Sequence, residues 1–339
     1  MKALTFLAAT AVFTGALATE AMADGRNPGS VLIYPVHRSG GNLNAWFTIL
    51  CVTNTNTMPQ TPVTLGGGTN VHFEYVNITP GTTPFLPAAC TIFDRIEYLT
   101  PADTLCVLTS CHNAFGGMGQ EGYVVVTAED PAQSPGWAWD HDFLIGSEML
   151  LSASGVAYMI NAIPFNAIAA NPALPGGPLQ FDGVNYEGIS DVLMTDFVAA
   201  TNSQLALINM TGGPMVENQV YLSVWNDNER ALSATFRFRC WIDLPLATIS
   251  PLFSNAFLSA LPNDPTELDI TCNGIGDLET GWMTIDSQGV FYSNGQPFAP
   301  GLGDGALLGS ITAGPASVQG GHLLWEHPRK QLNGAFRTP

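Results

Sequence analysis

The apolar residues of this chain fall in short stretches, and polar side chains alternate with them inside each stretch. In the segment 235–241, Phe236, Phe238 and Cys240 alternate with two arginines and a tryptophan. A period of two places successive side chains on opposite faces of a strand, whereas a helix requires a period of 3.6. Gly, Pro, Asn and Ser bound the stretches, as is typical of turns. The pattern predicts an all-β protein.

Strands are expected where the stretches are rich in Val, Ile, Thr and aromatic residues. In the first part of the chain the predicted strands are 31–36, 45–53, 71–76, 91–98, 104–109, 123–128, 143–150 and 157–164. In the second part they are 192–199, 204–210, 219–226, 233–242, 281–286 and 305–312, with a short one at 322–325. So many short strands in each part favour a sandwich or a barrel.

Several segments recur in the same order in the second part of the chain. Residues 30–36 match 191–197, 49–54 match 207–212, 71–77 match 220–226, 122–126 match 281–285, and 144–148 match 307–311. The offsets stay between roughly 149 and roughly 163 residues, a period that indicates tandem domains because solenoid repeats are much shorter. We therefore predict two tandem, internally duplicated β-sandwich domains, which resemble immunoglobulin-like surface modules.

The domain boundaries follow from composition. The connecting segment between the matched parts is rich in Ala, Pro and Gly, which is typical of a linker. The predicted units are a signal peptide at 1–23, a first domain at 24–166, the linker at 167–185, a second domain at 186–328 and a C-terminal tail at 329–339.

The N-terminus has the pattern of a secretory signal peptide. Lys2 precedes an apolar run, and Ala21-Met22-Ala23 places small residues before a cleavage site. This run is shorter than the roughly 20 residues that cross a bilayer, and no later stretch stays apolar for about 18 residues. We predict cleavage near Ala23, no transmembrane segment, and a secreted, periplasmic or extracellular protein.

The chain is strongly acidic, with 10 Lys and Arg against 28 Asp and Glu and a net charge of −18. Nucleic acids and anionic membranes are bound through basic patches, so we expect neither as a partner. Only 11% of the residues are charged and 46% are hydrophobic, which gives weak protection against self-association. The composition permits self-association or attachment to an extracellular matrix or surface component.

Six cysteines in an exported chain predict three disulfides. Two of them are alone in the second domain, and the repeat suggests that the first domain inherited the same bridge. The predicted pairs are Cys240–Cys272, Cys90–Cys111 and Cys51–Cys106, and the alternative within the first domain is Cys51–Cys90 with Cys106–Cys111.

The segment 136–143 carries the candidate ligand chemistry. Trp137 and Trp139 alternate, so both rings can point outward and stack on a sugar, or they can cover the open end of the sandwich. Asp140 and Asp142 follow, and two loop carboxylates suit calcium. We predict no cofactor other than this calcium. The alternative for the carboxylates is an acidic turn capped by its own side chains.

No G-x-S-x-G, P-loop or C-x-x-C motif occurs in the chain, and we predict no catalytic residues. We expect an exported, non-enzymatic β-sandwich protein with a structural, adhesive or self-assembling role. The alternative is a carbohydrate-binding or glycan-processing protein that uses Trp137 and Trp139.

The strand at 31–36 is the candidate for assembly. Pro35 cannot donate a ladder hydrogen bond and is typical of sheet edges, where a strand can add to a neighbouring sheet. The alternative is that this strand closes its own domain.

Overall fold

The structure is a computed structural model. It describes residues 27–39, 46–113, 120–133, 136–152, 155–211, 215–261, 266, 268–298, 304–314 and 319–326. The predicted signal peptide at 1–23 and the tail at 329–339 lie outside these ranges. The fold is nearly all-β, as predicted, with helical segments of three or four residues. No helix in the described ranges is long and apolar enough to cross a membrane.

We call the region from β1 to β9 the first half and the region from β10 to β18 the second half. The strands of the first half are β1 (Val31–Ser39), β2 (Trp46–Asn54), β3 (Thr69–Thr79), β4 (Ala89–Leu99), β5 (Thr104–Leu108), β6 (Gln120–Glu129), β7 (Leu144–Ser152), β8 (Ala157–Asn161) and β9 (Ile163–Phe165). The strands of the second half are β10 (Val192–Val198), β11 (Gln204–Asn209), β12 (Val216–Asn226), β13 (Ala231–Arg239), β14 (Trp241–Pro245), β15 (Thr280–Tyr292), β16 (Leu307–Ala313), β17 (Gly320–Leu323) and β18 (Trp325–Glu326). The helical turns are α1 (Thr109–His112), α2 (Leu246–Ile249), η2 (Pro251–Phe253) and α3 (Asn255–Leu258).

The two halves have the same antiparallel strand pairings. In the first half the order β4-β3-β6-β1-β9 forms one group and β5-β2-β7-β8 another. The second half repeats this order as β13-β12-β15-β10-β18 and β14-β11-β16-β17. Each of these strands has a number nine higher than its counterpart in the first half. A contact of β1 with β2 at Ser39 and Phe47 merges the first half into one nine-stranded sheet.

The registers correspond as well, which identifies counterpart residues in the two halves. Leu32 of β1, Val126 of β6 and Phe73 of β3 form one row, and Leu193 of β10, Ile285 of β15 and Leu222 of β12 form the same row in the second half. The matched segments that include these residues therefore lie on corresponding strands in the same register.

Two glycines explain why one of the matched segments recurs. A Cβ atom on Gly122 would lie 1.9 Å from the carbonyl oxygen of Val76, and one on Gly281 would lie 2.3 Å from that of Trp225. Real Cβ atoms do not approach this closely, so glycine is required where β6 meets β3 and where β15 meets β12.

One predicted match, 49–54 with 207–212, is wrong by three residues. Asn54 lies opposite Leu144, and Asn209 lies opposite the counterpart Leu307. The amides of Asn54 and Asn209 donate to the carbonyl oxygens of Gly67 and Val216, at 2.7 and 3.2 Å. These buried asparagines, rather than the apolar residues around them, mark the true alignment.

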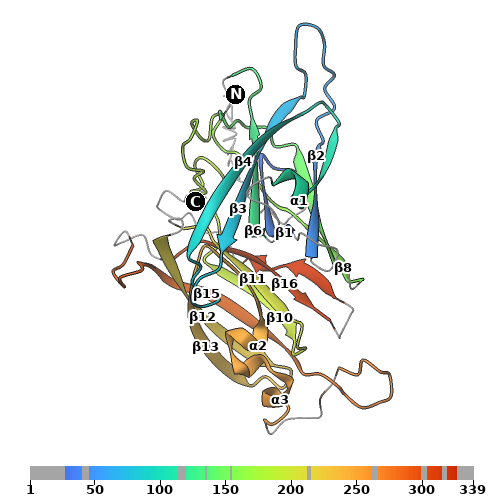
Figure 1. Ribbon diagram of the computed structural model, residues 1–339, viewed down its shortest axis with the longest axis vertical. Coiled ribbons are helices and arrows are strands. Elements are labelled where there is room, and N and C mark those ends of the chain that lie inside the picture. The colour runs from blue at the N-terminus through green and yellow to red at the C-terminus, as the bar shows by residue number, and fades with distance from the viewer. Residues whose placement is uncertain are drawn as a thin grey trace, which may run out of the picture.

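Three hydrophobic cores hold the chain together. The core inside the first half is formed by residues such as Leu32, Phe73 and Val126, and the core inside the second half by residues such as Leu193, Leu222 and Ile285. A third core combines residues of both halves, and Figure 1 shows β11 and β16 at this junction, below the strands of the first half.

The strand β1 is central rather than at an edge, which corrects the expectation for assembly. It pairs with β6 on one side and with β9 on the other, and all nine residues from Val31 to Ser39 are buried. Pro35 lies where the β1–β6 register shifts between Tyr34 and His37, so its missing N–H costs no ladder bond there. Strand addition through β1 is therefore not available to the folded chain.

The predicted linker contributes to the shared core. Phe181 is fully buried and packs with its ring centroid 4.7 Å from that of Phe165 on β9. Leu179 and Tyr186 belong to the same core. The Ala, Pro and Gly of this segment thus form its turns, while its few large side chains attach it to the first half.

Candidate functional site

One of the two disulfides in the described chain joins the halves. Cys51 and Cys106 lie opposite each other on β2 and β5 and are bonded, as predicted. Cys90, on β4, is bonded to Cys240.

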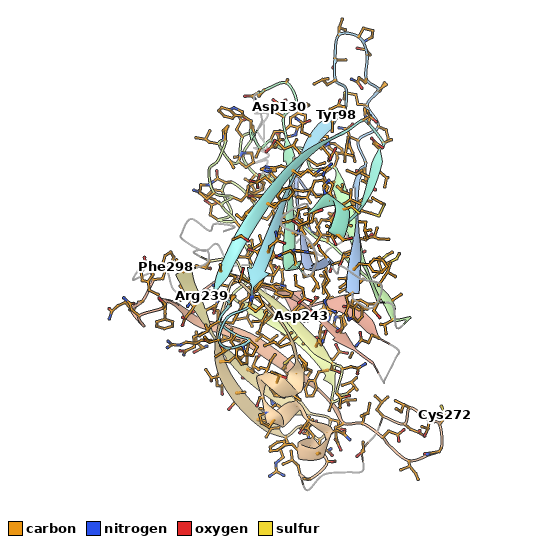
Figure 2. All side chains as sticks on the ribbon, in the orientation of Figure 1. Tyr98, Asp130, Arg239, Asp243, Cys272 and Phe298 are labelled. Atoms are coloured by element: carbon orange, nitrogen blue, oxygen red, sulfur yellow. A yellow bond between two sulfur atoms is a disulfide. The ribbon has the colours of Figure 1, made fainter. Side chains whose placement is uncertain are left out.

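The other predicted pairs, Cys90–Cys111 and Cys240–Cys272, are therefore wrong, and Cys111 and Cys272 are exposed free thiols. In Figure 2, Cys272 lies on a loop that extends away from the second half.

The wrong pairing has a specific cause. Cys90 lies at the start of β4 and Cys240 directly precedes β14, but β14 is the counterpart of β5, not of β4, in the pairing order. Cys240 is buried at the junction and faces the first half. The two bonded cysteines are 150 residues apart, and closing a loop of that length contributes about 5 kcal/mol in the chain-entropy model.

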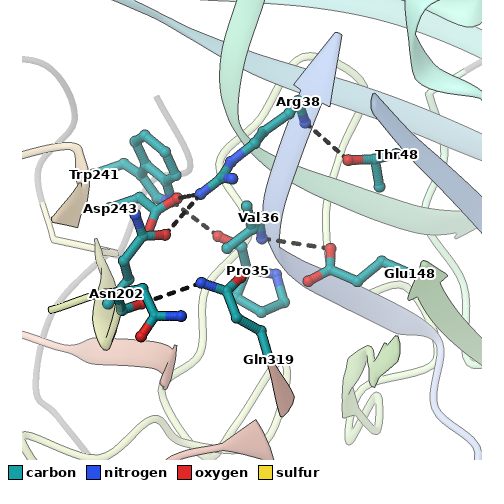
Figure 3. A network of polar contacts seen from close by, with 10 residues as sticks. Pro35, Val36, Arg38, Thr48, Glu148, Asn202, Trp241, Asp243 and Gln319 are labelled. Carbon is teal, nitrogen blue, oxygen red and sulfur yellow. Dashed lines mark hydrogen bonds and ion pairs between the residues drawn. The ribbon is translucent and has the colours of Figure 1, made fainter. Parts of the chain in front are cut away.

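A buried ion pair links the halves at the same junction (Figure 3). The guanidinium of Arg38 on β1 contacts the carboxylate of Asp243 on β14, and both side chains are buried. Arg38 also donates to Oε1 of Gln204 at 3.0 Å and lies 4.7 Å from the ring centroid of Trp46. Burial lowers the pKa of Arg38, but Asp243 together with Tyr158 and Glu121 raises it more, so the guanidinium stays charged.

Aromatic and backbone contacts extend the junction. The indole Nε1 of Trp241 donates to the carbonyl oxygen of Pro35 at 2.8 Å. The backbone N–H of Arg239 donates to the carbonyl oxygen of Phe85 at 3.1 Å, and the rings of Phe85 and Phe236 have centroids 5.5 Å apart. Together with the disulfide and the ion pair, these contacts fix the two halves to each other.

Glu148 is a fully buried acid beside this junction. Its Oε2 accepts a hydrogen bond from the backbone N–H of Val36 at 3.4 Å, and burial raises its pKa well above the ordinary value. An acid with such a pKa is a candidate for proton transfer when it lines a cleft. Glu148 is fully buried, so a substrate cannot reach it in this fold and its role is structural.

A second cluster of ionisable side chains lies on β3 and the adjacent strand β6. His72 Nδ1 is 2.9 Å from Glu129 Oε1, and burial raises the pKa of the nearby Glu74 to about 7. In the part of the chain that the structure describes, no three His, Cys, Asp or Glu side chains are arranged to hold a metal ion.

The tryptophans predicted to bind a ligand are both half-buried. The indole Nε1 of Trp139 donates to Thr69 Oγ1 at 3.1 Å, and its ring stacks on His141 with centroids 5.1 Å apart. Trp139 also packs on the core of the first half. The carbonyl oxygen of Trp137 accepts from the N–H of Asp130 at 2.8 Å. A sugar-binding role of Trp137 and Trp139 stays a prediction.

The two carboxylates predicted to bind calcium differ in their surroundings. Asp140 is exposed, whereas Asp142 is half-buried and its Oδ1 accepts from the N–H of Ala167 at 2.9 Å. Burial raises the pKa of Asp142. Asp142 thus fastens the start of the segment 167–185 to the first half, and calcium binding by the pair stays a prediction.

The outer face of the sheet β13-β12-β15-β10-β18 carries exposed aromatic side chains. Trp225 and Trp282 lie opposite each other and stack with ring centroids 4.2 Å apart. Trp325, opposite Met194, is 65% exposed, and Trp282 is 45% exposed. We call the surface formed by Tyr221, Trp225, Trp282, Met194 and Trp325 the aromatic face.

The corresponding surface of the first half is buried. The counterparts of Trp225 and Trp282 are Val76 and Tyr123, and those of Met194 and Trp325 are Ile33 and Ile163. All four counterparts belong to the core shared by the two halves. The same sheet thus meets protein in one half and solvent in the other.

The outer face of β5-β2-β7-β8 is a second apolar surface. Leu108, Ile49, Met149 and Met159 form one row across these strands, and Ile145 lies on β7 near that row. Leu108, Ile145 and Met159 are exposed, and a recess of about 430 Å³ opens beside Ile145. We call the surface formed by these five residues the aliphatic face.

The roles of Arg38, of the aromatic face and of the aliphatic face were not predicted from the sequence. Tyr221 and Trp225 occupy outward positions of a strand whose inward residues are Leu222 and Val224, so the alternation already placed aromatic rings on the surface. Arg38 is one of only 10 basic residues in the chain, which was a signal for a specific role.

No protein-family model matches the chain, and no curated protein or solved structure does either.

Proposed function

We propose that this chain is an exported, non-enzymatic protein with a structural, adhesive or self-assembling role, built from two copies of one immunoglobulin-like β-sandwich. The matching pairings and registers of the two halves support a duplication. The signal-peptide pattern and the two disulfides support export, because disulfides persist in oxidising compartments.

The exposure of the aromatic face is the observation that carries the assembly role. Single proteins rarely leave contiguous apolar patches larger than a few hundred Å² in water, and larger patches mark interaction sites. Trp282 and Trp325 are exposed on the outer side of a sheet, whereas their counterparts Tyr123 and Ile163 are covered by protein. A surface of this kind supports binding to another protein surface.

The fixed junction supports a structural role. The Cys90–Cys240 bridge and the buried Arg38–Asp243 pair hold the halves in one arrangement. A subunit that transmits an orientation through an assembly benefits from such a rigid connection.

Self-association is tested by light scattering after size exclusion, on the chain purified after export, over a range of concentrations. The expected result is a molar mass that rises with concentration, with filaments or sheets in negative-stain images. A chain that stays monomeric at every concentration would contradict the assembly role.

Carbohydrate binding is the second candidate, and the stacked Trp225–Trp282 pair favours it because flat exposed rings suit the apolar faces of sugars. The test is retention on insoluble polysaccharides. Loss of retention in Trp282→Ala, with retention intact in Trp137→Ala, would assign the aromatic face to a glycan; retention lost in Trp137→Ala instead would assign the site to the loop.

A further inference from the structure

We propose that the aromatic face of one copy packs against the aliphatic face of a second copy, head to tail, so that the contact between the halves of one chain is repeated between chains. This inference rests on the proposed self-association and names its surfaces.

The internal junction is the template for this contact. Within the chain, β1 contacts β11 and β16, and β6 contacts β14. The outer face of β4-β3-β6-β1-β9 therefore meets the outer face of β14-β11-β16-β17, and residues such as Tyr123, Ile208 and Leu308 share one core.

Among the residues that the structure describes, nothing covers the counterparts of these two surfaces. The sheet β13-β12-β15-β10-β18 corresponds to the buried surface of the first half, and it carries the aromatic face. The group β5-β2-β7-β8 corresponds to the docking surface of the second half, and it carries the aliphatic face. The aliphatic face of a second copy would then cover the aromatic face. Within one chain, the outer face of β14-β11-β16-β17 covers the outer face of β4-β3-β6-β1-β9 in the same way.

The two faces share exposed apolar side chains. Trp282 and Trp325 are exposed on the aromatic face, and Ile145 at the margin of the aliphatic face borders a recess of about 430 Å³ that is also lined by polar residues such as Thr53 and Ser147.

The five residues that define each face are uncharged, but Asp196, opposite Trp282, and Asp286, opposite Tyr221, lie on the same side of the aromatic sheet. The chain as a whole has a net charge of −18. Repulsion between copies is screened by salt, so association through these faces should strengthen as ionic strength rises.

The size of the contact indicates reversible association. Five strands about 4.8 Å apart and seven residues at about 3.4 Å each give a face of roughly 24 by 24 Å. Stable interfaces bury about 800 Å² on each partner, and this face is somewhat smaller. The internal junction also uses Leu179 and Phe181 of the connecting segment, which the contact between chains would lack.

The geometry also determines the form of the assembly. The two faces lie on different sheets of one chain, so each contact leaves one free face at either end. Heterologous contacts of this kind produce open filaments unless the rotation between subunits closes a ring.

The test compares two single-face variants with a matched surface control. Trp282→Glu places a charge on the aromatic face, and Ile145→Glu places one on the aliphatic face. Val63→Glu adds the same charge at a residue that is 95% exposed and outside both faces. Circular dichroism and thermal melting verify that each variant folds, and Trp325→Glu repeats the first change at a second position.

We expect each face variant to raise the concentration for half-association at least tenfold and Val63→Glu to leave it unchanged. A mixture of Trp282→Glu with Ile145→Glu should form a dimer and nothing larger, because each variant keeps one intact face. A mixture that stays monomeric would overturn the head-to-tail arrangement.

The remaining outcomes separate this inference from the proposed function. If the wild-type chain assembles and both face variants assemble equally well, self-association stands and these surfaces are wrong. If the wild-type chain is monomeric at every concentration, the assembly role fails and the inference fails with it. A monomer that binds polysaccharide only while Trp282 is intact would assign the aromatic face to a glycan and overturn the inference.

Discussion

The sheets β4-β3-β6-β1-β9 and β13-β12-β15-β10-β18 share pairings and registers but not surroundings. All of β1 is buried, whereas β10 alternates between buried residues and residues that contact solvent. The inward rows, Leu32 with Phe73 and Leu193 with Leu222, are equally apolar in both sheets. The inward row therefore determines the sandwich, and the outward row determines what the sandwich meets.

The largest loss of stability is expected on removal of the Cys90–Cys240 bridge, which holds the second half against the first sheet. The variant Cys90→Ser/Cys240→Ser should lose about 5 kcal/mol of unfolding free energy, because the unfolded chain regains a long loop. Guanidinium unfolding followed by tryptophan fluorescence measures the change. Cys111→Ser, at an exposed free thiol, is the control and should change the stability by less than about 0.5 kcal/mol; equal losses in both variants would contradict the bridge.

Arg38→Met is expected to cost about 3–5 kcal/mol, because it leaves Asp243 buried without its counter-charge. Arg237→Met is the matched control on the exposed sheet and should cost about 0–1 kcal/mol. Thermal unfolding of both variants measures the difference. The double variant Arg38→Met/Asp243→Leu should recover part of the loss, and a further loss there would show that the pair is not the cause.

Tyr123 and Trp282 occupy the same position in the two sheets and provide the most direct comparison. Tyr123→Ala should cost about 3–5 kcal/mol, since the ring is fully buried. Trp282→Ala should cost about 1 kcal/mol, mainly the stacking on Trp225. Chemical denaturation of the two variants measures both, under conditions where the chain is monomeric. Similar losses would show that the aromatic face is covered within the monomer.

The smallest effect is expected from pH. Burial lowers the pKa of His37 and of His141, both in the first half, to about 4. An unfolded histidine titrates near 6.5, so the unfolded chain binds more protons between about pH 6.5 and 4, and stability falls as the pH falls through this range.

Glu74 opposes this fall. Its pKa is raised to about 7, so its contribution is present below the unfolded value and is lost as the pH rises through about 7. The raised pKa values of Glu148 and Asp142 act in the same direction as that of Glu74. Between pH 7.5 and 4 the melting temperature of Glu74→Gln should therefore fall relative to that of the wild-type chain, because the variant lacks one of these opposing contributions. An identical slope in the variant would show that Glu74 does not titrate in this window.

The elements that sequence alone could predict are those set by local chemistry. Alternation identified most strands, and Gly122 and Gly281 marked corresponding places because a side chain is excluded at both. The cysteine pairs failed for a different reason. Cys240 bonds across the junction, and the packing of two sandwiches leaves no pattern of its own in the spacing of cysteines.

Pro35 shows the same limit at a single residue. Its missing donor indicated an edge strand, but the register shift between Tyr34 and His37 accommodates it within a central strand. The contact of Arg38 with Asp243 joins residues that are distant in the sequence and nearby only after folding. Which outward face is covered is likewise decided by the docking of the halves.

The order of the bonded cysteines also determines how the chain would carry tension. Cys90 lies between Cys51 and Cys106 in the sequence, so the two bridges interleave. Force applied at the ends would enter at Cys51, cross to Cys106, return along β5 and β4 to Cys90, and cross to Cys240. Strands β6 to β13 lie outside this covalent path and would carry no load while both bridges are intact. Pulling on the two ends of one chain would thus leave β6 to β13 folded.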